Sequence, residues 1–308
     1  MKHKKLGLVL TTALAGAALV TLSACSSSSS TGASIITMKG DTIQVSDLYN
    51  EAKTFPNLPT TTLLQDITFD KIFSKEKDIA SAATDTKVND QYNKLKSQYG
   101  SQFDSALQQQ GLTEQNIKPY LKTQLLEQAA IENDIAKTQY TTANLKSAWS
   151  TYHPDVTAYV VSETSKDAAT KALAAAKKDA AGKASFEKTN ASSKTTFDST
   201  STTVPAEVQT AAWNLKNGEF SSVIESTDSS TGATTYYIVE MVKTSDKGTD
   251  MNKYKSKLQD IIKTQKEQDT TYVSGVIASY LKKYNVTVKE SSFSTLFQQF
   301  TQTSSSSN

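Results

Sequence analysis

Val156-Thr157-Ala158-Tyr159-Val160-Val161 is the stretch that decides the fold class, because four of its six residues are β-branched. Such residues favour a pleated strand, and a run with so little polarity is typical of a strand inside a sheet. Downstream, the apolar pattern predicts two helices and then two strands, over residues 166–181, 206–215, 223–225 and 234–242. Residues 152–243 are therefore predicted to form a small α+β unit.

Helical regions flank this unit on both sides. Apolar residues recur at helical spacing from Ser46 to Trp149 and again from Asp250 onward. Residues 35–45 show the pattern of a hairpin, and Ser46 is a suitable N-cap for the helix that follows. The predicted fold class is α+β: a mostly helical domain made from the N- and C-terminal segments, with the α+β unit inserted between them.

The first residues carry the features of a bacterial lipoprotein leader. A basic start precedes a short apolar run, and Leu22-Ser23-Ala24-Cys25 follows at once. This arrangement is typical of a signal peptide rather than a membrane span, although a signal peptide cut at an ordinary site or a retained anchor are alternatives. Leu-Ser-Ala-Cys resembles the lipobox, whose cysteine is lipidated, and Cys25 is the only cysteine of the chain.

Lipidation of Cys25 would anchor the protein. We expect an S-diacylglycerol and an N-palmitoyl group on Cys25, since two acyl chains hold a protein stably at a bilayer where one binds only marginally. The predicted location is the extracytoplasmic face of the cell membrane. The predicted parts of the chain are a signal peptide (1–24), a Ser-rich tether (25–34), a helical N-terminal region (35–149), the α+β unit (150–246), a C-terminal helical segment packing on the N-terminal region (247–300) and a disordered tail (301–308).

Composition argues against several classes of function. All 33 basic residues are lysines, and the mature chain would carry 30 of them against 31 acidic residues, a formal charge of −1. A nearly neutral chain without arginine is poorly suited to bind phosphate groups, so no nucleic-acid partner is expected. One cysteine and two histidines in the whole chain exclude a cysteine-based zinc site and a histidine cluster. No metal or other cofactor is expected.

No catalytic motif stands out. The chain has no Gly-rich phosphate loop, no Gly-x-Ser-x-Gly elbow and no His-Glu-x-x-His. His153, beside Pro154, is expected to be a solvated loop residue. Two sets of carboxylates are expected to lie on solvated helix faces: Asp66 and Asp70, and Glu127, Glu132 and Asp134.

Two segments of the mature chain, together with the lipobox, resemble the PrsA-type foldase lipoproteins, which are extracytoplasmic folding factors of Gram-positive bacteria. Met38-Lys39-Gly40-Asp41-Thr42-Ile43, followed by Asp47-Leu48, is similar to the family's opening pattern. The run from Ala211 to Ser221 (Ala-Ala-Trp-Asn-Leu-Lys-Asn-Gly-Glu-Phe-Ser) is similar to the run Ala-Ala-Phe-x-Leu-x-x-Gly-Glu-x-Ser of parvulin-type peptidyl-prolyl isomerases. The resemblance covers nearly the whole chain and implies a parvulin-like fold for the inserted unit.

The inserted unit departs from the parvulin pattern at both family histidines. The first-strand histidine position falls on Tyr159 or Val160, and the last-strand position is occupied by Tyr237. No catalytic residue is therefore assigned. The segment Phe197-Asp198-Ser199-Thr200-Ser201 also replaces the family's Gly-Asp-Leu-Gly.

The substrate pocket that the resemblance implies remains apolar. The Met and Phe that line the family's proline pocket fall on Val204 and Val208, and Trp213 and Tyr237 complete the predicted pocket. Prolyl isomerisation needs no nucleophile, because an apolar, preorganised site that holds the twisted amide lowers a barrier of about 18–20 kcal/mol. Loss of the histidine pair is therefore expected to leave peptidyl-prolyl cis-trans isomerase activity weak or lost.

The resemblance implies a membrane-anchored foldase or chaperone that assists newly secreted proteins after translocation. Its partners would be unfolded or newly secreted chains, and a homodimer is left open. The alternative from another class is a solute-binding or adhesin lipoprotein. Solute receptors usually show repeated βαβ units, which the helical–β–helical order of this chain fits badly.

Overall fold

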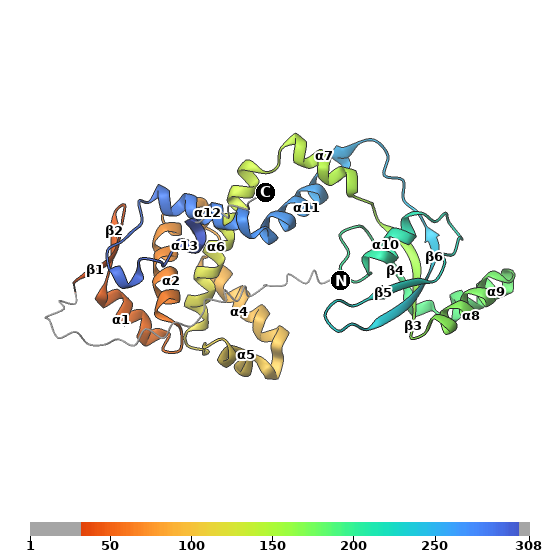
Figure 1. Ribbon diagram of the computed structural model, residues 1–308, viewed down its shortest axis with the longest axis horizontal. Coiled ribbons are helices and arrows are strands. Elements are labelled where there is room, and N and C mark those ends of the chain that lie inside the picture. Colours follow the sequence, from red (N-terminus) through yellow and green to blue (C-terminus); the bar gives the residue numbers. More distant parts are fainter. Residues whose placement is uncertain (1–31, 302–308) are drawn as a thin grey trace. The chain divides into compact units, whose positions relative to one another are not determined.

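The structure, a computed structural model, describes residues 32–301. The predicted signal peptide, Cys25, most of the tether and the tail from residue 302 lie outside the described residues. The chain forms two compact units: unit 1 is Met1–Asp134 with Asp269–Asn308, and unit 2 is Ile135–Gln268 (Figure 1). The predicted boundaries after residues 149 and 246 differ from this division, because the helical segments on either side of the α+β unit belong partly to unit 2.

Unit 1 contains a sheet that joins the two ends of the chain. Strands β1 (Ser34–Met38) and β2 (Asp41–Gln44) form the predicted hairpin, and β7 (Thr287–Val288) pairs with the other edge of β1, all antiparallel. Gly40 has a φ of +73° at the hairpin turn, a conformation that favours glycine. The hairpin is confirmed, and it ties the N-terminal segment to the C-terminal one.

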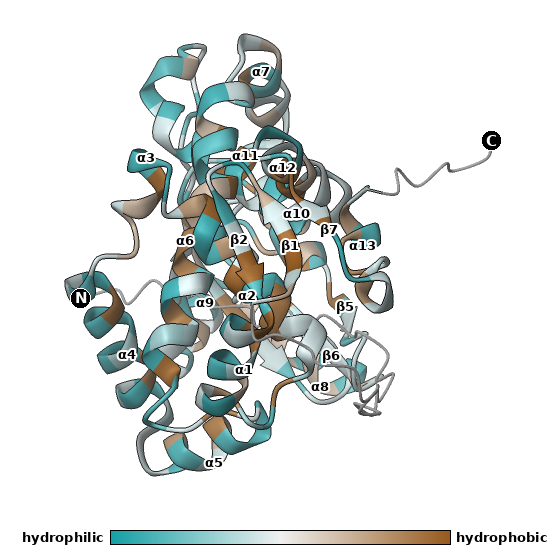
Figure 2. Ribbon diagram, turned by 90° about the vertical axis from the view of Figure 1, so that its left-hand side faces the viewer, coloured by the Kyte–Doolittle hydropathy of each residue, from teal (hydrophilic) through white to brown (hydrophobic). Residues whose placement is uncertain are grey.

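Helices form the rest of unit 1, some packed against this sheet and some in a second apolar cluster that contains no residue of it. They are α1 (Val45–Thr54), α2 (Thr60–Phe73), α3 (Lys77–Ala80), α4 (Asp85–Tyr99), α5 (Phe103–Gln109), α6 (Ile117–Thr138), α12 (Thr270–Lys283) and α13 (Gln298–Thr301). One apolar cluster contains Ile36 of β1, Phe73 of α2 and Ile277 of α12, so both ends of the chain contribute to it. Figure 2 shows hydrophobic residues along β1 in brown.

The first helix begins one residue before the predicted N-cap. Helix α1 starts at Val45, with Gln44 rather than Ser46 at the N-cap position. The Asp47 carboxylate accepts a hydrogen bond from the Gln44 backbone N–H at 2.8 Å, so an acid of the first turn satisfies the backbone donor of the N-cap residue itself.

Unit 2 is built on a four-stranded antiparallel sheet with the order β4-β3-β6-β5. Its strands are β3 (Val156–Glu163), β4 (Lys194–Phe197), β5 (Ile224–Thr227) and β6 (Thr234–Lys243). The prediction that 156–161 lies inside a sheet is confirmed, whereas β4 was not predicted. Helices α8 (Lys166–Lys177) and α9 (Ala180–Thr189) pack on one face of this sheet, and α10 (Ala206–Trp213) packs on the other.

Two further helices complete unit 2. Helices α7 (Thr142–Thr151) and α11 (Lys255–Gln268) pack on each other through a small apolar cluster of Leu145, Ala148, Tyr152, Leu258 and Ile262. The α+β class is confirmed. None of the helices within residues 32–301 is both long enough and apolar enough to cross a membrane.

Candidate functional site

Side-chain alternation along β3 separates Tyr159 and Val160, the two residues at the first family histidine position, onto opposite faces of the sheet. Val160 contacts the apolar cluster beneath α10, whereas Tyr159 belongs to the cluster beneath α8 and α9. Tyr237 on β6 packs on the same side as Val160. Because successive strand residues point to opposite faces, Val160 and Tyr237 share one face of the sheet and Tyr159 lies on the other. The α10 face is defined here by Val160, Val204, Val208, Trp213 and Tyr237.

The predicted pocket residues on the α10 face differ in how far solvent can reach them. Val208 is fully buried, and Val204 is only 6% exposed. Trp213 and Tyr237 are partly exposed. The structure thus brings all four predicted pocket residues together, with the valines in the packed layer under α10 and the two aromatic side chains reaching the surface.

A polar loop borders the α10 face. The Asp198 carboxylate is almost fully buried. It accepts a hydrogen bond from the Thr200 backbone N–H at 2.9 Å and forms an ion pair with Lys257 Nζ at 2.7 Å. Burial acts to raise the pKa of Asp198, but the hydrogen bonds from Lys257 and Thr200 outweigh it and hold the pKa below its usual value. This ion pair joins the loop after β4 to α11.

Gln209 fixes the other end of this loop. Its buried side-chain amide donates hydrogen bonds to the carbonyl oxygens of Ser201 and Val204, at 2.9 and 2.8 Å. The segment that replaces the family's Gly-Asp-Leu-Gly is therefore held by two buried polar side chains, Asp198 and Gln209. Sequence reasoning missed both roles, because the groups that satisfy them are brought close only by the fold.

His153 lies at the corner between α7 and β3. The side chain is exposed, as expected, but it is not an isolated loop residue: its ring is stacked on Trp213, with centroids 4.8 Å apart and an interplanar angle of 3°. Burial of one side of the ring, with a smaller contribution from Lys247, lowers the pKa of His153. The predicted site therefore has an additional aromatic neighbour.

The opposite side of the sheet carries two polar clefts. A cleft of about 440 Å³ lies between the α8–α9 turn and the 218–220 loop, and one of about 180 Å³ adjoins it around Glu240. Lys183 of α9 lines both clefts and forms an ion pair with the buried Glu240 carboxylate. Tyr159 lines the smaller cleft, which places it away from the α10 face.

The carboxylates of unit 1 do not all lie on solvated faces, so that prediction is wrong for two of them. Burial raises the pKa of Asp66 to about 7 and that of Glu127 to about 8, and nearby acids add to both shifts. Glu51 of α1 also has a raised pKa, because of its burial and of Asp70. Packing of α1, α2 and α6 has gathered acids that are far apart in the sequence.

The other acids of these sets have close partners. Lys122 Nζ lies 2.7 Å from an Asp70 carboxylate oxygen. Glu132 accepts a hydrogen bond from Gln128 at 2.8 Å, and Asp134 accepts one from the Tyr272 hydroxyl at 2.5 Å. The contacts of Asp70 and Asp134 link α6 to α2 and to α12, whereas that of Glu132 lies within α6.

Comparison with known proteins gives the family. No family model matches the chain. A foldase protein PrsA from Lactococcus lactis subsp. lactis is 75% identical over 307 residues, which cover 100% of this chain and 99% of that protein. The chain belongs to the PrsA foldase family. A foldase protein PrsA from Streptococcus agalactiae is 36% identical over 294 residues, 94% of each chain.

Solved PrsA structures have the same fold. The crystal structure of PrsA from Lactococcus lactis is 73% identical, with a TM-score of 0.81, and matches 88% of this chain and 100% of that chain. The structure of PrsA from Streptococcus pneumoniae is 33% identical with a TM-score of 0.70, and matches 87% of this chain and 100% of that one. Membership in the PrsA family gives the chain a foldase or chaperone role.

Proposed function

We propose that this PrsA foldase works outside the cytoplasmic membrane, anchored through lipids on Cys25, and assists the folding of secreted proteins chiefly by holding unfolded segments. Isomerisation of prolyl bonds on the α10 face is weak or lost in this proposal. The support comes from the PrsA family, from the leader ending in Cys25, and from the residues at the two family histidine positions.

The observation that carries the proposal is the pair Val160 and Tyr237 on the α10 face. In the resemblance to parvulins these positions belong to histidines, whose ring nitrogens donate and accept hydrogen bonds. Val160 has no hydrogen-bonding side-chain atom, and Tyr237 has one hydroxyl. An apolar face with exposed aromatic side chains binds unfolded segments by burying their apolar groups, whereas stabilising a twisted amide also requires preorganised polar groups.

The first experiment is a proline-limited refolding assay beside an aggregation assay, with the chain from Ser26 onward and the same secreted client. We expect suppressed aggregation and little acceleration of the proline-limited phase. Strong acceleration would overturn the loss of catalysis, and failure to suppress aggregation would overturn the holding function. Tyr237→His is compared in both assays, because a gain of acceleration in this variant would locate the missing group on the α10 face.

Anchoring is tested separately. Cys25→Ala removes the sulfur that the predicted diacylglycerol requires, so we expect the variant to leave the membrane fraction. Retention of the variant in that fraction would contradict lipid anchoring. The homodimer stays a prediction, which the mass of the protein in solution tests.

A further inference from the structure

The backbone of His153 is fixed to the loop that follows β4. The His153 N–H donates a hydrogen bond to the Ser199 hydroxyl at 2.9 Å, and the Ser199 N–H donates one to the His153 carbonyl at 3.1 Å. The same loop is held from the other side by the ion pair between the buried Asp198 carboxylate and Lys257. The imidazole ring therefore projects from a backbone position that two hydrogen bonds define.

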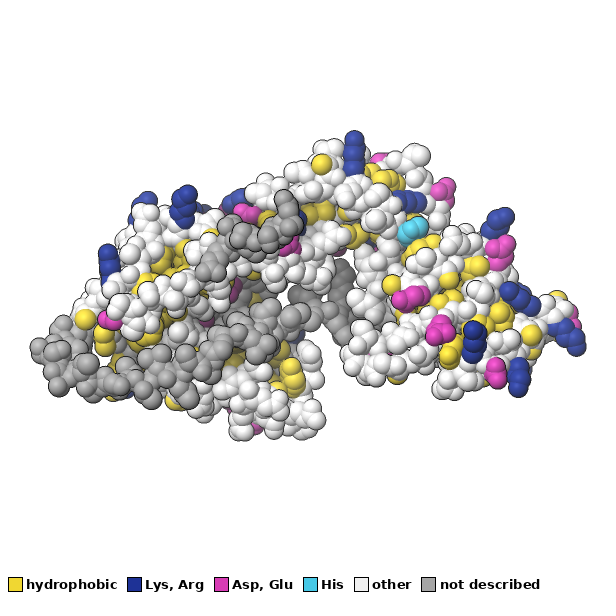
Figure 3. All heavy atoms as spheres, in the orientation of Figure 1, with side chains coloured by type: hydrophobic (Ala, Val, Ile, Leu, Met, Phe, Trp, Pro, Cys, Tyr) yellow, Lys and Arg dark blue, Asp and Glu magenta, His cyan; other side chains and the backbone are white. Residues whose placement is uncertain are grey.

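The ring of His153 completes an aromatic stack on the α10 face. Trp213 contacts two rings: His153 at 4.8 Å with nearly parallel planes, and Phe197 at 5.4 Å with planes inclined by 49°. Phe197 is buried, whereas Trp213 is partly exposed. Trp213 is the last residue of α10, so no following helical turn packs against its side chain. The contacts with the two rings therefore help to fix the orientation of the indole. Figure 3 shows a histidine side chain (cyan) at the surface of unit 2, next to hydrophobic side chains (yellow).

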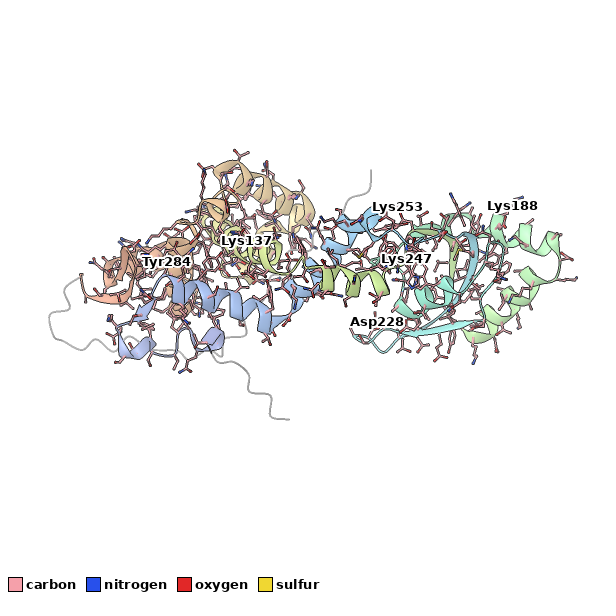
Figure 4. The ribbon with its side chains drawn as sticks, turned by 90° about the horizontal axis from the view of Figure 1, so that it is seen from above. Lys137, Lys188, Asp228, Lys247, Lys253 and Tyr284 are labelled. Atoms are coloured by element: carbon pink, nitrogen blue, oxygen red, sulfur yellow. The ribbon has the colours of Figure 1, made fainter. Side chains whose placement is uncertain are left out.

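Burial, and then the positive charge at this corner, lower the pKa of His153, which favours the neutral imidazole near pH 7. Lys247 contributes a positive charge beside the ring; its ammonium group is 4.2 Å from the Trp149 ring centroid and donates to the Trp149 carbonyl near the end of α7 (Figure 4). The nearby carboxylate of Asp198 is neutralised by Lys257. Asp155, two residues along the chain, is exposed. His153 thus stacks on Trp213 as an uncharged aromatic ring.

We propose that His153 is a positioning residue, which holds the Trp213 indole ring at the surface of the α10 face so that unfolded client segments contact it. This inference rests on the proposed holding function and names a residue through which it works. His153 itself acts only through Trp213: removing its ring frees the indole to leave the orientation in which it stacks on His153 and contacts Phe197.

The contact is tested with tryptophan emission in the Trp149→Phe variant, where Trp213 is the only tryptophan left. A protonated imidazole quenches an adjacent indole, so emission should show a transition as His153 becomes protonated, at a more acid pH than that at which a free imidazole titrates. The transition should vanish in the same variant carrying His153→Phe. An emission curve that is unchanged by His153→Phe would overturn the stacking.

Client binding is tested with a reduced and alkylated, permanently unfolded protein as the probe. His153→Ala should weaken its binding about two- to tenfold, the range expected for the loss of one aromatic pair, and His153→Phe should restore binding. Lys188→Ala, an exposed change on α9, is the matched control and should bind as the unmodified chain does. Equal binding by His153→Ala, or no rescue by His153→Phe, would overturn the inference.

The outcomes separate this inference from the proposed function. If the unmodified chain does not suppress aggregation, the holding function itself is wrong. If the chain suppresses aggregation but Trp213 emission does not change on adding the unfolded probe, the holding function stands and only the role of the His153–Trp213 pair is overturned. Far-UV circular dichroism of each variant confirms that the comparison is made between folded proteins.

Discussion

Replacing Glu127 with glutamine is expected to stabilise unit 1 at alkaline pH and to leave it nearly unchanged in acid. The pKa of Glu127 is raised from 4.5 to about 8, first by burial and then by Asp66, whose own pKa rises from 3.8 to about 7. A carboxyl with a raised pKa in the folded state binds more protons folded than unfolded between the two pKa values. The free energy of unfolding therefore falls as the pH rises from about 4 to about 8.

The size of the effect follows from the pKa change. One pKa unit corresponds to about 1.4 kcal/mol, so the shift of Glu127 sets an upper limit on the order of 4–5 kcal/mol. Glu127 is partly rather than fully shielded from solvent, and water that reaches its carboxylate lowers this penalty. We therefore expect Glu127→Gln to gain about 2 kcal/mol at pH 8.5 and to match the unmodified chain below about pH 4.5, where the glutamate is also neutral.

The assay is urea unfolding of the chain from Ser26 onward at pH 4.5 to 8.5, followed by two signals. Both tryptophans lie in unit 2, so their emission reports that unit, while far-UV circular dichroism reports the helices of both units. We expect the gain in the circular dichroism transition alone. Asp104→Asn, which removes an exposed acid from α5, is the control. Stability of the unmodified chain that does not change between pH 4.5 and 8.5, or a loss in Glu127→Gln at pH 8.5, would refute the reasoning.

Three further changes are expected to weaken the units. Lys257→Met leaves the buried Asp198 carboxylate without its cation and should lower the free energy of unfolding of unit 2 by about 1–3 kcal/mol at pH 7, followed by tryptophan emission. Because the pKa of Asp198 is lowered in the folded state, this loss should disappear in strong acid, and a loss that persists there would contradict the ion-pair explanation. Gly182→Ala places a Cβ 2.2 Å from the Ala175 carbonyl oxygen, so the α8–α9 turn must open; a melting temperature equal to that of the unmodified chain would contradict this clash. Ile36→Ala removes a fully buried side chain from β1, the strand between β2 and β7, and should lower the free energy of unfolding of unit 1 by about 2–4 kcal/mol in urea. A loss below about 1 kcal/mol would mean that the surrounding residues close around the smaller side chain.

Local sequence chemistry predicted the elements that depend on it. The β-branched run at Val156 fixed an inner strand, and the Lys-Gly-Asp turn at Gly40 fixed the first hairpin, because side-chain branching and positive φ act within a few residues. The strand β4 was missed, since Lys194-Thr195-Thr196-Phe197 is short and polar enough to look like a loop. The alanine-rich stretch after Lys166 looked like one helix, although Asp179 starts a second one by accepting a hydrogen bond from the Gly182 N–H.

The features that sequence missed at the site are those that tertiary packing creates. The α10 face was predicted residue by residue through family resemblance, but the choice of Val160 over Tyr159 required the register of β3. The stack of His153 on Trp213 joins the start of one strand to the end of a distant helix. Likewise, the raised pKa of Glu127 comes from its burial and then from Asp66 on another helix, and no spacing along one helix would reveal it.

Holding and isomerising place different demands on one surface, and the α10 face meets them unequally. Holding an unfolded segment needs accessible apolar area, which Trp213 and Tyr237 supply, and it does not need a hydrogen bond directed at one amide. Isomerisation needs donors fixed toward the carbonyl of the twisted bond, and their benefit depends on placement within a fraction of an ångström. In the proposed function, Val160 at a position that the resemblance assigns to a histidine removes much of the second function and adds apolar area to the first. The packed valines and the aromatic stack are therefore the features whose substitution tests the proposed function.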